Sequence, residues 1–416
     1  MRQPPFRPLI LTIGWIFLPM IAPVAAAHPP LPSVRYSVPI DRTKPDLGLP
    51  SLPHATTQRL YTGVPTPELG AYSHHSHLAF FNGILVASWS NHWLDEDAPG
   101  QYVRFSLSRD LGETWTDPTS PAAVLFPPMD AARQNTDRRY DKSKEFYTMC
   151  ANGYAVVDSV LYAIAEPSRG INNPGIGRVA RAVGTDGKLG PVFWLNSPHE
   201  TPHLNQDAYQ NPTHAALGPI AGRILESLRD PRHMPQWDFF GWPQLDGRKV
   251  GGWAAAFGAT KRLQSVTEPT YAYEMPDGTY ARFWRTHAGT QYVHFSLDRG
   301  LHWSDLENTD FPDGGSRSNV GNLPDGTAYV INNPVERDPL TLALARDGRT
   351  FSAVALINQG AGQNRHPGRA KIKGYQYPHA VVGGGFLFVL YSANKEDICF
   401  TKIPLDDISA LLRTRR

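Results

Sequence analysis

The chain has 416 residues, with 40 Lys and Arg against 38 Asp and Glu, so its formal net charge is only +2. That balance gives no general case for a nucleic-acid or membrane partner. The sequence holds no phosphate-binding Gly loop, Cys-rich zinc pattern or nucleophile elbow. The function classes defined by those motifs are therefore not indicated.

The amino terminus is predicted to be a secretory signal covering residues 1–27. Arg2 and Arg7 form a basic start, Leu9–Ala27 is apolar, and small residues suit cleavage near Ala27. A membrane anchor is the alternative, but prolines interrupt the apolar run. We expect a secreted or periplasmic protein.

Strand signals recur after a Pro-rich lead-in at residues 28–57. Short β-rich runs broken by turn residues predict hairpins, and these cover residues 77–89, 154–165, 271–284, 320–331 and 380–391. Residues 205–265 are expected to add one or two more, and Ala215–Leu228 has near-helical apolar spacing. Repeated hairpins with Gly and aromatic punctuation are typical of β-propeller blades.

One motif repeats along the chain and indicates a repeat architecture. Ser-x-Ser-x-Asp-x-Gly-x-x-Trp fits Ser106–Trp115, returns at Phe295–Trp303, and has a weaker copy at Leu344–Phe351. Its Asp can accept hydrogen bonds from following backbone N–H groups, and its Gly supplies a positive φ. The motif is an Asp-box, and it resembles the hairpin of sialidase-type β-propellers.

That resemblance implies an all-β fold, a single sialidase-like β-propeller of six or seven blades, with seven favoured by the chain length. The propeller is expected at residues 58–408, followed by a short basic tail at 409–416. In the resembling family the motif is structural, so Asp110, Asp298 and Asp347 are expected in turns at the outer rim. Of the two cysteines, Cys150 and Cys399, we expect buried free thiols, although an oxidising compartment permits a bridge.

A cluster of histidines is the first candidate for chemistry. Tyr72–His77 reads YSHHSH, and His92 follows across a predicted hairpin, so the two groups can meet at one end of a blade. Histidine titrates near neutrality and can transfer protons. Ordinary buried histidines are one alternative. Zinc on His75 and His77 is another, although no third ligand is evident.

This hairpin resembles the first blade of propeller polysaccharide lyases that act on ulvan, and of relatives that release terminal L-rhamnose from glucuronate in plant arabinogalactan. The matching segments are His74–His77, Trp89–Asn91 and Glu96–Gln101. Two histidines, a tyrosine and an arginine work in that family. The resemblance places them at His75 (or His74), His92, Tyr162 and Arg178.

The chemistry suits such a set of residues. Arginine clamps and neutralises a uronate carboxylate, a histidine or tyrosine takes the C5 proton, and another acid protonates the leaving oxygen. The expected activity is cleavage of a glycosidic bond next to a uronic acid, with release of terminal L-rhamnose from glucuronate by β-elimination preferred. Hydrolysis on the same scaffold stays open.

A second resemblance covers residues 266–405, which are similar to exo-sialidases. Sialidases use three arginines on the substrate carboxylate, an acid–base Asp, and a Tyr nucleophile assisted by a Glu. The candidates for these roles are Arg285, Arg369, Glu268, and Tyr375 or Tyr377. The early Arg-Ile-Pro motif and a matching acid–base Asp are absent, so exo-α-sialidase activity is the alternative function.

Trp237 belongs to an aromatic run that suits either inter-blade packing or a sugar-stacking wall. A non-catalytic glycan-binding propeller is a third alternative, because fold does not determine function. We expect a monomer with an acidic poly- or oligosaccharide as substrate, no nucleic acid or membrane partner, and no metal among the catalytic residues. No cofactor is expected to be required, and a structural calcium or zinc ion stays open.

Overall fold

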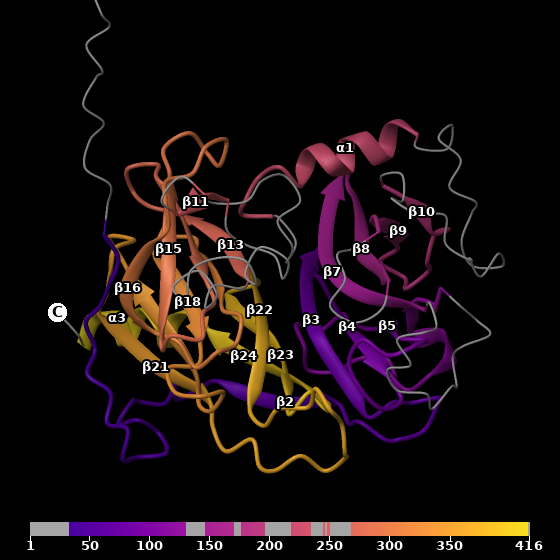
Figure 1. Ribbon diagram of the computed structural model, residues 1–416, viewed down its shortest axis with the longest axis horizontal. Helices are drawn as coiled ribbons and strands as arrows, with labels where there is room; N and C mark the ends of the chain where they lie inside the picture. The colour runs from indigo at the N-terminus through magenta and orange to yellow at the C-terminus, as the bar shows by residue number, and fades with distance from the viewer. Residues whose placement is uncertain are drawn as a thin grey trace, which may run out of the picture. The chain divides into compact units, whose positions relative to one another are not determined.

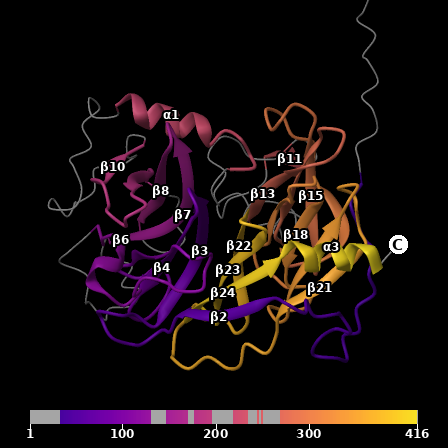
Figure 2. The ribbon, with the colours of Figure 1, turned by 180° about the vertical axis from the view of Figure 1, so that it is seen from behind.

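A computed structural model describes residues 33–129, 146–169, 176–195, 218–233 and 268–414, together with the backbone of two short strands. The predicted signal at residues 1–27, and Trp237, lie outside the described residues. Antiparallel strands dominate the remainder (Figures 1 and 2).

Five four-stranded sheets follow one another along the described chain, each formed of neighbouring antiparallel strands. The first holds β3 (Tyr72–Phe81), β4 (Ile84–His92), β5 (Tyr102–Ser108) and β6 (Val124–Phe126). The second holds β7 (Tyr147–Val157), β8 (Val160–Arg169), β9 (Val179–Val183) and β10 (Phe193–Trp194). The third holds β13 (Pro269–Glu274), β14 (Tyr280–Trp284), β15 (Thr290–Ser296) and β16 (Glu307–Pro312).

The last two sheets differ in their strands, because only the fifth combines strands from both ends of the described chain. The fourth holds β17 (Asn319–Asn322), β18 (Ala328–Asn332), β19 (Leu340–Ala345) and β21 (Ala353–Asn358). In the fifth, β22 (Tyr375–Gly383), β23 (Phe386–Ala393) and β24 (Asp397–Pro404) are joined by the early strand β2 (Thr56–Tyr61), which pairs with β24. Two-stranded pairs are β1 (Arg35–Tyr36) with β20 (Thr350–Phe351), and β11 (Gln244–Leu245) with β12 (Arg248–Lys249).

The structure confirms the five predicted hairpins, because each predicted turn joins two consecutive strands that pair in one sheet: β3 with β4, β7 with β8, β13 with β14, β17 with β18, and β22 with β23. Asn82 and Gly83, for example, have φ values of 48° and 81° between β3 and β4. Two successive positive φ values are what a tight two-residue hairpin requires, and Asn-Gly supplies them at little cost. Five four-stranded sheets in the described residues agree with propeller blades, while six or seven blades remains a prediction.

The Asp-boxes close turns as predicted. The Oδ1 atom of Asp110 accepts hydrogen bonds from the Ser108 hydroxyl at 2.8 Å and from the Thr114 backbone N–H at 2.9 Å. Asp298 has the same two contacts, with Ser296 and His302, each at 2.8 Å. Asp110 and Asp347 are exposed and Asp298 is partly exposed. These aspartates therefore shape turns, and none of them belongs to the buried site described below.

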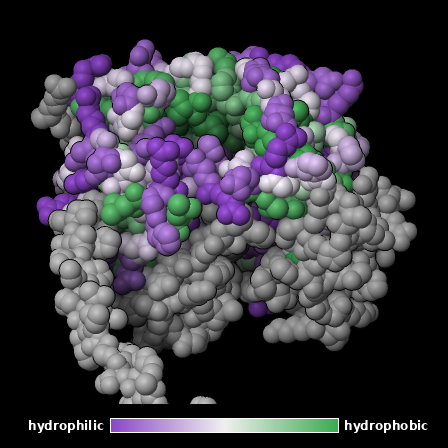
Figure 3. Space-filling view, turned by 90° about the horizontal axis from the view of Figure 1, so that it is seen from above, coloured by the Kyte–Doolittle hydropathy of each residue, from purple (hydrophilic) through white to green (hydrophobic). Residues whose placement is uncertain are grey.

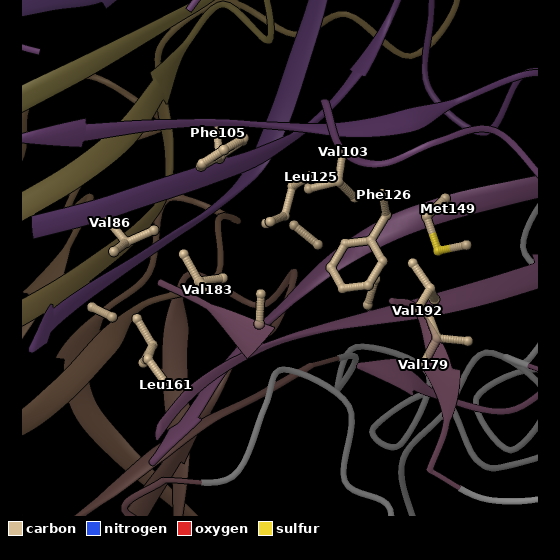
Figure 4. Packing of buried hydrophobic residues seen from close by; sticks show 14 of the residues in the cluster. Val86, Val103, Phe105, Leu125, Phe126, Met149, Leu161, Val179, Val183 and Val192 are labelled. Atoms are coloured by element: carbon tan, nitrogen blue, oxygen red, sulfur yellow. The ribbon is translucent and has the colours of Figure 1, made fainter. Parts of the chain in front are cut away.

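The core lies between successive sheets. In Figure 4, Val86 of the first sheet lies near Leu161 and Val183 of the second, and Phe126 of the first lies near Met149 of the second; all five side chains belong to one buried apolar cluster. Strands that face another sheet on both sides are apolar on both sides, as β19 and β23 are. On the face in Figure 3, hydrophilic residues are interspersed with smaller apolar areas.

Helical structure is limited in the described residues to α1 (Pro219–Ser227), α3 (Leu405–Thr414) and the short 3-10 helix Pro121–Ala123. α1 lies inside the predicted helix 215–228. α3 includes most of the predicted basic tail, because Ile408 and Leu412 bury their side chains against the fourth and fifth sheets. None of the helices searched in the described residues has the length and apolar character of a membrane span. Cys150 and Cys399 are buried and free, as expected.

Candidate active site

We call β3, β7, β13, β17 and β22 first strands, because each is an edge strand that begins a run of hairpin-linked strands. First strands of neighbouring sheets lie side by side, and they carry His74, His75 and Tyr377 of the site. β3 contacts β7 and β22, and β17 contacts β13 and β22. Four of these first strands have an irregular register near their start, between His74 and His77 in β3 and between Gln376 and His379 in β22, for example. β-Bulges re-aim side chains and are common beside active sites. His75 and Tyr377 take φ values of 50° and 49° within these irregularities.

Tyr377 is held by a carboxylate and a guanidinium. Its hydroxyl lies 2.6 Å and 2.8 Å from the two carboxylate oxygens of Glu268. Nη1 of Arg285 donates to the Tyr377 oxygen at 3.0 Å and to Glu268 Oε2 at 2.9 Å. All three side chains are at most 8% exposed. The contacts fix the phenol oxygen and give its proton an acceptor.

The electrostatics keep the carboxylate charged and the phenol neutral. Burial opposes ionisation of Glu268, but the charges of Arg285 and Arg317 and the hydrogen bond from Tyr377 outweigh it and lower the pKa of Glu268 to about 2. Burial, and then the charge of Glu268, raise the pKa of Tyr377 well above its ordinary value. Glu268 is therefore an ionised base in contact with a protonated phenol, as an activated nucleophile requires.

Two further arginines surround Tyr377. The guanidinium of Arg317 lies over the Tyr377 ring, 4.8 Å from its centroid. Arg337 donates from Nη1 to the side-chain oxygen of Gln376 and from Nη2 to the Gly315 carbonyl at 2.8 Å. Arg317 is 2% exposed and Arg337 is 8% exposed. Three buried guanidiniums near one carboxylate leave an excess of positive charge that suits an anionic ligand.

A pair of histidines with an acid also lies beside Tyr377. The ring centroids of His74 and His75 are 4.1 Å and 5.5 Å from that of Tyr377. Nε2 of His75 is 3.5 Å from Glu96, whose carboxylate also pairs with Lys395 and accepts from the Tyr72 hydroxyl at 3.2 Å. Burial lowers the pKa of His75 to about 4, against the attraction of Glu96. His75 is thus a neutral ring at pH 7 beside the phenol.

His74, His75 and Glu96 could hold a metal ion, because one ligand atom from each lies within 4.8 Å of the others. The ammonium group of Lys395 already pairs with Glu96. A divalent cation at this position would face that positive charge at close range and would have to displace it from the carboxylate. Proton transfer therefore fits these residues better than metal binding.

The sequence-predicted site residues divide into two groups. Glu268, Arg285, Tyr377, His74 and His75 come together: the first two contact the Tyr377 hydroxyl, and the histidine rings contact the Tyr377 ring. Of the two candidate tyrosines, Tyr375 instead packs against Tyr391 in the core and donates to the Gln359 carbonyl at 3.1 Å.

The other predicted residues lie apart from Tyr377. Both ring nitrogens of His92 are engaged by loop backbone: Nδ1 accepts from Leu94 and Asp95 at 3.2 Å and 3.1 Å, and Nε2 lies 3.2 Å from the Pro99 carbonyl. A catalytic role for His92 stays a prediction. Tyr162 packs against Phe193, in the apolar cluster that includes α1.

The two remaining arginines differ in burial. Arg178 is 1% exposed and its Nε is 3.8 Å from Glu166. Its charge, like that of Arg317, opposes the rise that burial causes in the pKa of Tyr271. Arg369 is exposed, and its backbone N–H bonds to Asp95. The roles proposed for both from the sequence stay predictions.

Sequence reasoning missed Arg317 and Arg337. Each is a single arginine beside a strand, in Ser316–Ser318 and Val335–Asp338, and neither belongs to a motif. The available signal was position: Arg317 stands just before β17, the first strand of its sheet, where Glu268 stands before β13.

Comparisons with known proteins agree with this architecture. A BNR repeat-like domain model matches residues 230–389, and a model described as an N-terminal β-propeller matches residues 57–238. No curated protein matches the chain significantly.

Solved structures show the same fold. A structure named as a sialidase is 23% identical with a TM-score of 0.69 over 90% of this chain, which spans only 35% of that protein. A leech intramolecular trans-sialidase complexed with 2,7-anhydro-Neu5Ac is 13% identical, with a TM-score of 0.53. The match covers 85% of this chain and 71% of the leech protein chain. Trypanosoma rangeli sialidase is 12% identical with a TM-score of 0.52, in a structure with 2,3-difluorosialic acid as a covalent intermediate. The match covers 88% of this chain and 61% of the Trypanosoma rangeli chain. The described sheets therefore have a sialidase-like propeller fold, with BNR repeat-like sequence in the second half of the chain.

Proposed function

We propose that the protein is a glycosidase that releases a terminal sugar bearing a carboxylate on its anomeric carbon, a 2-ulosonic acid of the sialic-acid type. The observation that carries the proposal is the Tyr377 oxygen held between the Glu268 carboxylate and Arg285. An anomeric carbon beside a carboxylate repels an anionic carboxylate nucleophile. A neutral phenol that gives up its proton during attack avoids that repulsion.

Arginines supply the other half of the recognition. Arg285 lies at the phenol oxygen, and Arg337 is held beside it through Gln376, the residue preceding Tyr377. A carboxylate on the reacting carbon must lie close to the nucleophile, so guanidiniums at this position can bind it during the reaction. The planar donors of arginine match carboxylate geometry, and they are strongest where water is excluded.

The reaction proceeds in two balanced steps. The Tyr377 oxygen bonds to the anomeric carbon, its proton passes to Glu268, and the bond to the leaving oxygen breaks as the imidazolium form of His75, populated below its pKa of about 4, protonates that oxygen. Water then attacks the anomeric carbon and gives its proton to His75, while the Tyr377 oxygen departs and recovers its proton from Glu268. Two displacements at the same carbon retain its configuration.

The test is an assay on terminal 2-ulosonic acid glycosides, sialosides included, with the released sugar followed by proton nuclear magnetic resonance. We expect the free acid to appear first in the anomeric configuration of the substrate. Inverted product would contradict the nucleophilic role of Tyr377, and absence of release from every such glycoside would contradict the substrate class.

A second candidate is the uronate lyase reaction expected from the first hairpin. The observation in its favour is the contact of His74 and His75 with the Tyr377 ring, which places two proton-transfer groups beside buried arginines. In that reaction a neutral His75 would take the C5 proton of glucuronate. Gum arabic and ulvan are the test substrates, and an ultraviolet-absorbing unsaturated uronate would be the product.

A further inference from the structure

One buried guanidinium near the nucleophile, that of Arg317, has two terminal nitrogens without a hydrogen-bond partner in the described part of the chain. Nη1 and Nη2 of Arg317 both lack a hydrogen-bond partner among the described residues, and the side chain is 2% exposed. Glu268 is the acid whose charge acts on Arg317. Its carboxylate oxygens are bonded to Tyr377 and Arg285. A charge buried in this way is costly unless something of opposite charge joins it.

Two histidines and a tyrosine that feel the charge of Arg317 have ring nitrogens or a hydroxyl in contact with other groups. Nδ1 of His379 accepts the Leu78 backbone N–H at 3.1 Å, so Nε2 of the neutral ring carries the hydrogen. The Tyr271 hydroxyl lies 3.5 Å from Nδ1 of His77, and Nε2 of His77 has no partner among the described residues. A hydrogen bond with the Ala151 backbone also acts on His77, so which of its two nitrogens carries the hydrogen depends on the tautomer.

These groups form one layer across three first strands. The rings of His77 and His379 are 5.1 Å apart, and those of His379 and Tyr271 are 5.2 Å apart. The charge of Arg317 acts on all three, since it lowers the pKa values of His77 and His379 and opposes the rise in that of Tyr271. His77 comes two residues after His75 along β3, and His379 comes two residues after Tyr377 along β22. The layer therefore lies further along these strands than the proposed nucleophile.

We propose that Arg317, His77 and His379 bind an anion, at a position separate from the contacts of Glu268 and Arg285 with Tyr377. The ligand is a small anion or a carboxylate. It has two sources: a free halide or formate ion, or a second acidic group carried by the substrate. Either would satisfy the Arg317 guanidinium and the Nε2–H of His379 together.

The direct test is a crystal of the wild-type protein soaked in sodium bromide. We expect an anomalous bromide peak within hydrogen-bonding reach of Arg317 Nη1 or Nη2. In parallel, the thermal midpoint should rise saturably with bromide at constant ionic strength kept with a large organic anion, because a ligand that binds only the folded state stabilises it. Absence of both the peak and the saturable rise would overturn the proposal.

Arg317→Met is the matching variant, and Arg104→Met is its control. Arg104 is also 2% exposed, but it bonds to the Pro118 and Glu68 carbonyls. Both substitutions remove a buried arginine, yet only Arg317→Met should abolish the response to bromide. A response that persists in Arg317→Met would refute the assignment, and if this variant does not fold, the bromide crystal of the wild-type protein decides alone.

Kinetic measurements then distinguish the two sources of the anion. Of the tests described, only this one depends on the proposed function. If the substrate provides it, bromide should inhibit competitively, and Arg317→Met should lose at least tenfold more kcat/KM on a dicarboxylic sugar than on its monocarboxylic analogue. If a free ion provides it, bromide should not compete and both sugars should be affected equally. Both outcomes support the anion site, and bromide binding remains measurable if no glycoside is cleaved.

Discussion

Replacing Glu268 by Gln removes the proposed base while keeping its shape. The amide of the substituted side chain could still accept one hydrogen bond, but it could not take the Tyr377 proton. General bases contribute about 10²–10⁴-fold to turnover. We therefore expect kcat on a 2-ulosonic acid glycoside to fall by about that factor, with KM changed much less.

The same substitution should change how stability depends on pH. A pKa lowered from 4.5 to about 2 corresponds to about 3 kcal/mol favouring the ionised form in the folded state. Because the folded pKa is the lower one, this stabilisation is complete above pH 4.5 and is lost as the pH falls toward 2. Urea unfolding of the wild-type protein across this window should therefore show a steeper loss of stability than Glu268→Gln shows.

Glu274→Gln is the matched control, because Glu274 ends the same strand and pairs with Arg232 at the surface. It should keep both the turnover and the pH dependence of the wild-type protein. The reasoning is refuted if Glu268→Gln keeps full kcat, or if its unfolding free energy falls with pH as steeply as that of the wild-type protein.

Three other predictions concern the histidines. His75→Ala should lower kcat at least a hundredfold with little loss of stability, whereas His92→Ala should cost about 1–3 kcal/mol of unfolding free energy by freeing buried loop N–H groups; urea unfolding and kinetics of both variants check this. With a His75 pKa of about 4, kcat/KM should fall as the pH rises through 4 if His75 donates the proton, and should rise there if His75 is the base of a lyase. Finally, a chelator should leave activity intact, because Lys395 already pairs with Glu96; a loss restored by zinc would contradict this.

Much of the fold could be predicted from the sequence because local turn chemistry determines it. Asn82-Gly83 permits the positive φ values of a hairpin turn, and the Asp-box aspartates close their turns with contacts only a few residues away. These are short-range effects that residue type and spacing reveal. Glu268 and Arg285 were also within reach, because they lie just outside the two ends of one hairpin.

The choice between Tyr375 and Tyr377 could not be made from the sequence. Residues two apart share a face of a regular strand, so alternation treats the two tyrosines alike. The irregularity between Gln376 and His379, with its positive φ at Tyr377, gives them different surroundings. Similarly, the backbone contacts that occupy both nitrogens of His92 depend on the path of the loop at 93–99, which no spacing rule predicts.

The central claim is that Tyr377 forms a covalent bond to the sugar. Mass spectrometry of the protein treated with 2,3-difluorosialic acid, and with difluoro analogues of other 2-ulosonic acids, tests it most directly. We predict that one such analogue adds its glycosyl mass to the peptide containing Tyr377, that Tyr375→Phe keeps the label, and that Tyr377→Phe loses it. Labelling of another residue, or undiminished labelling of Tyr377→Phe, would contradict the mechanism.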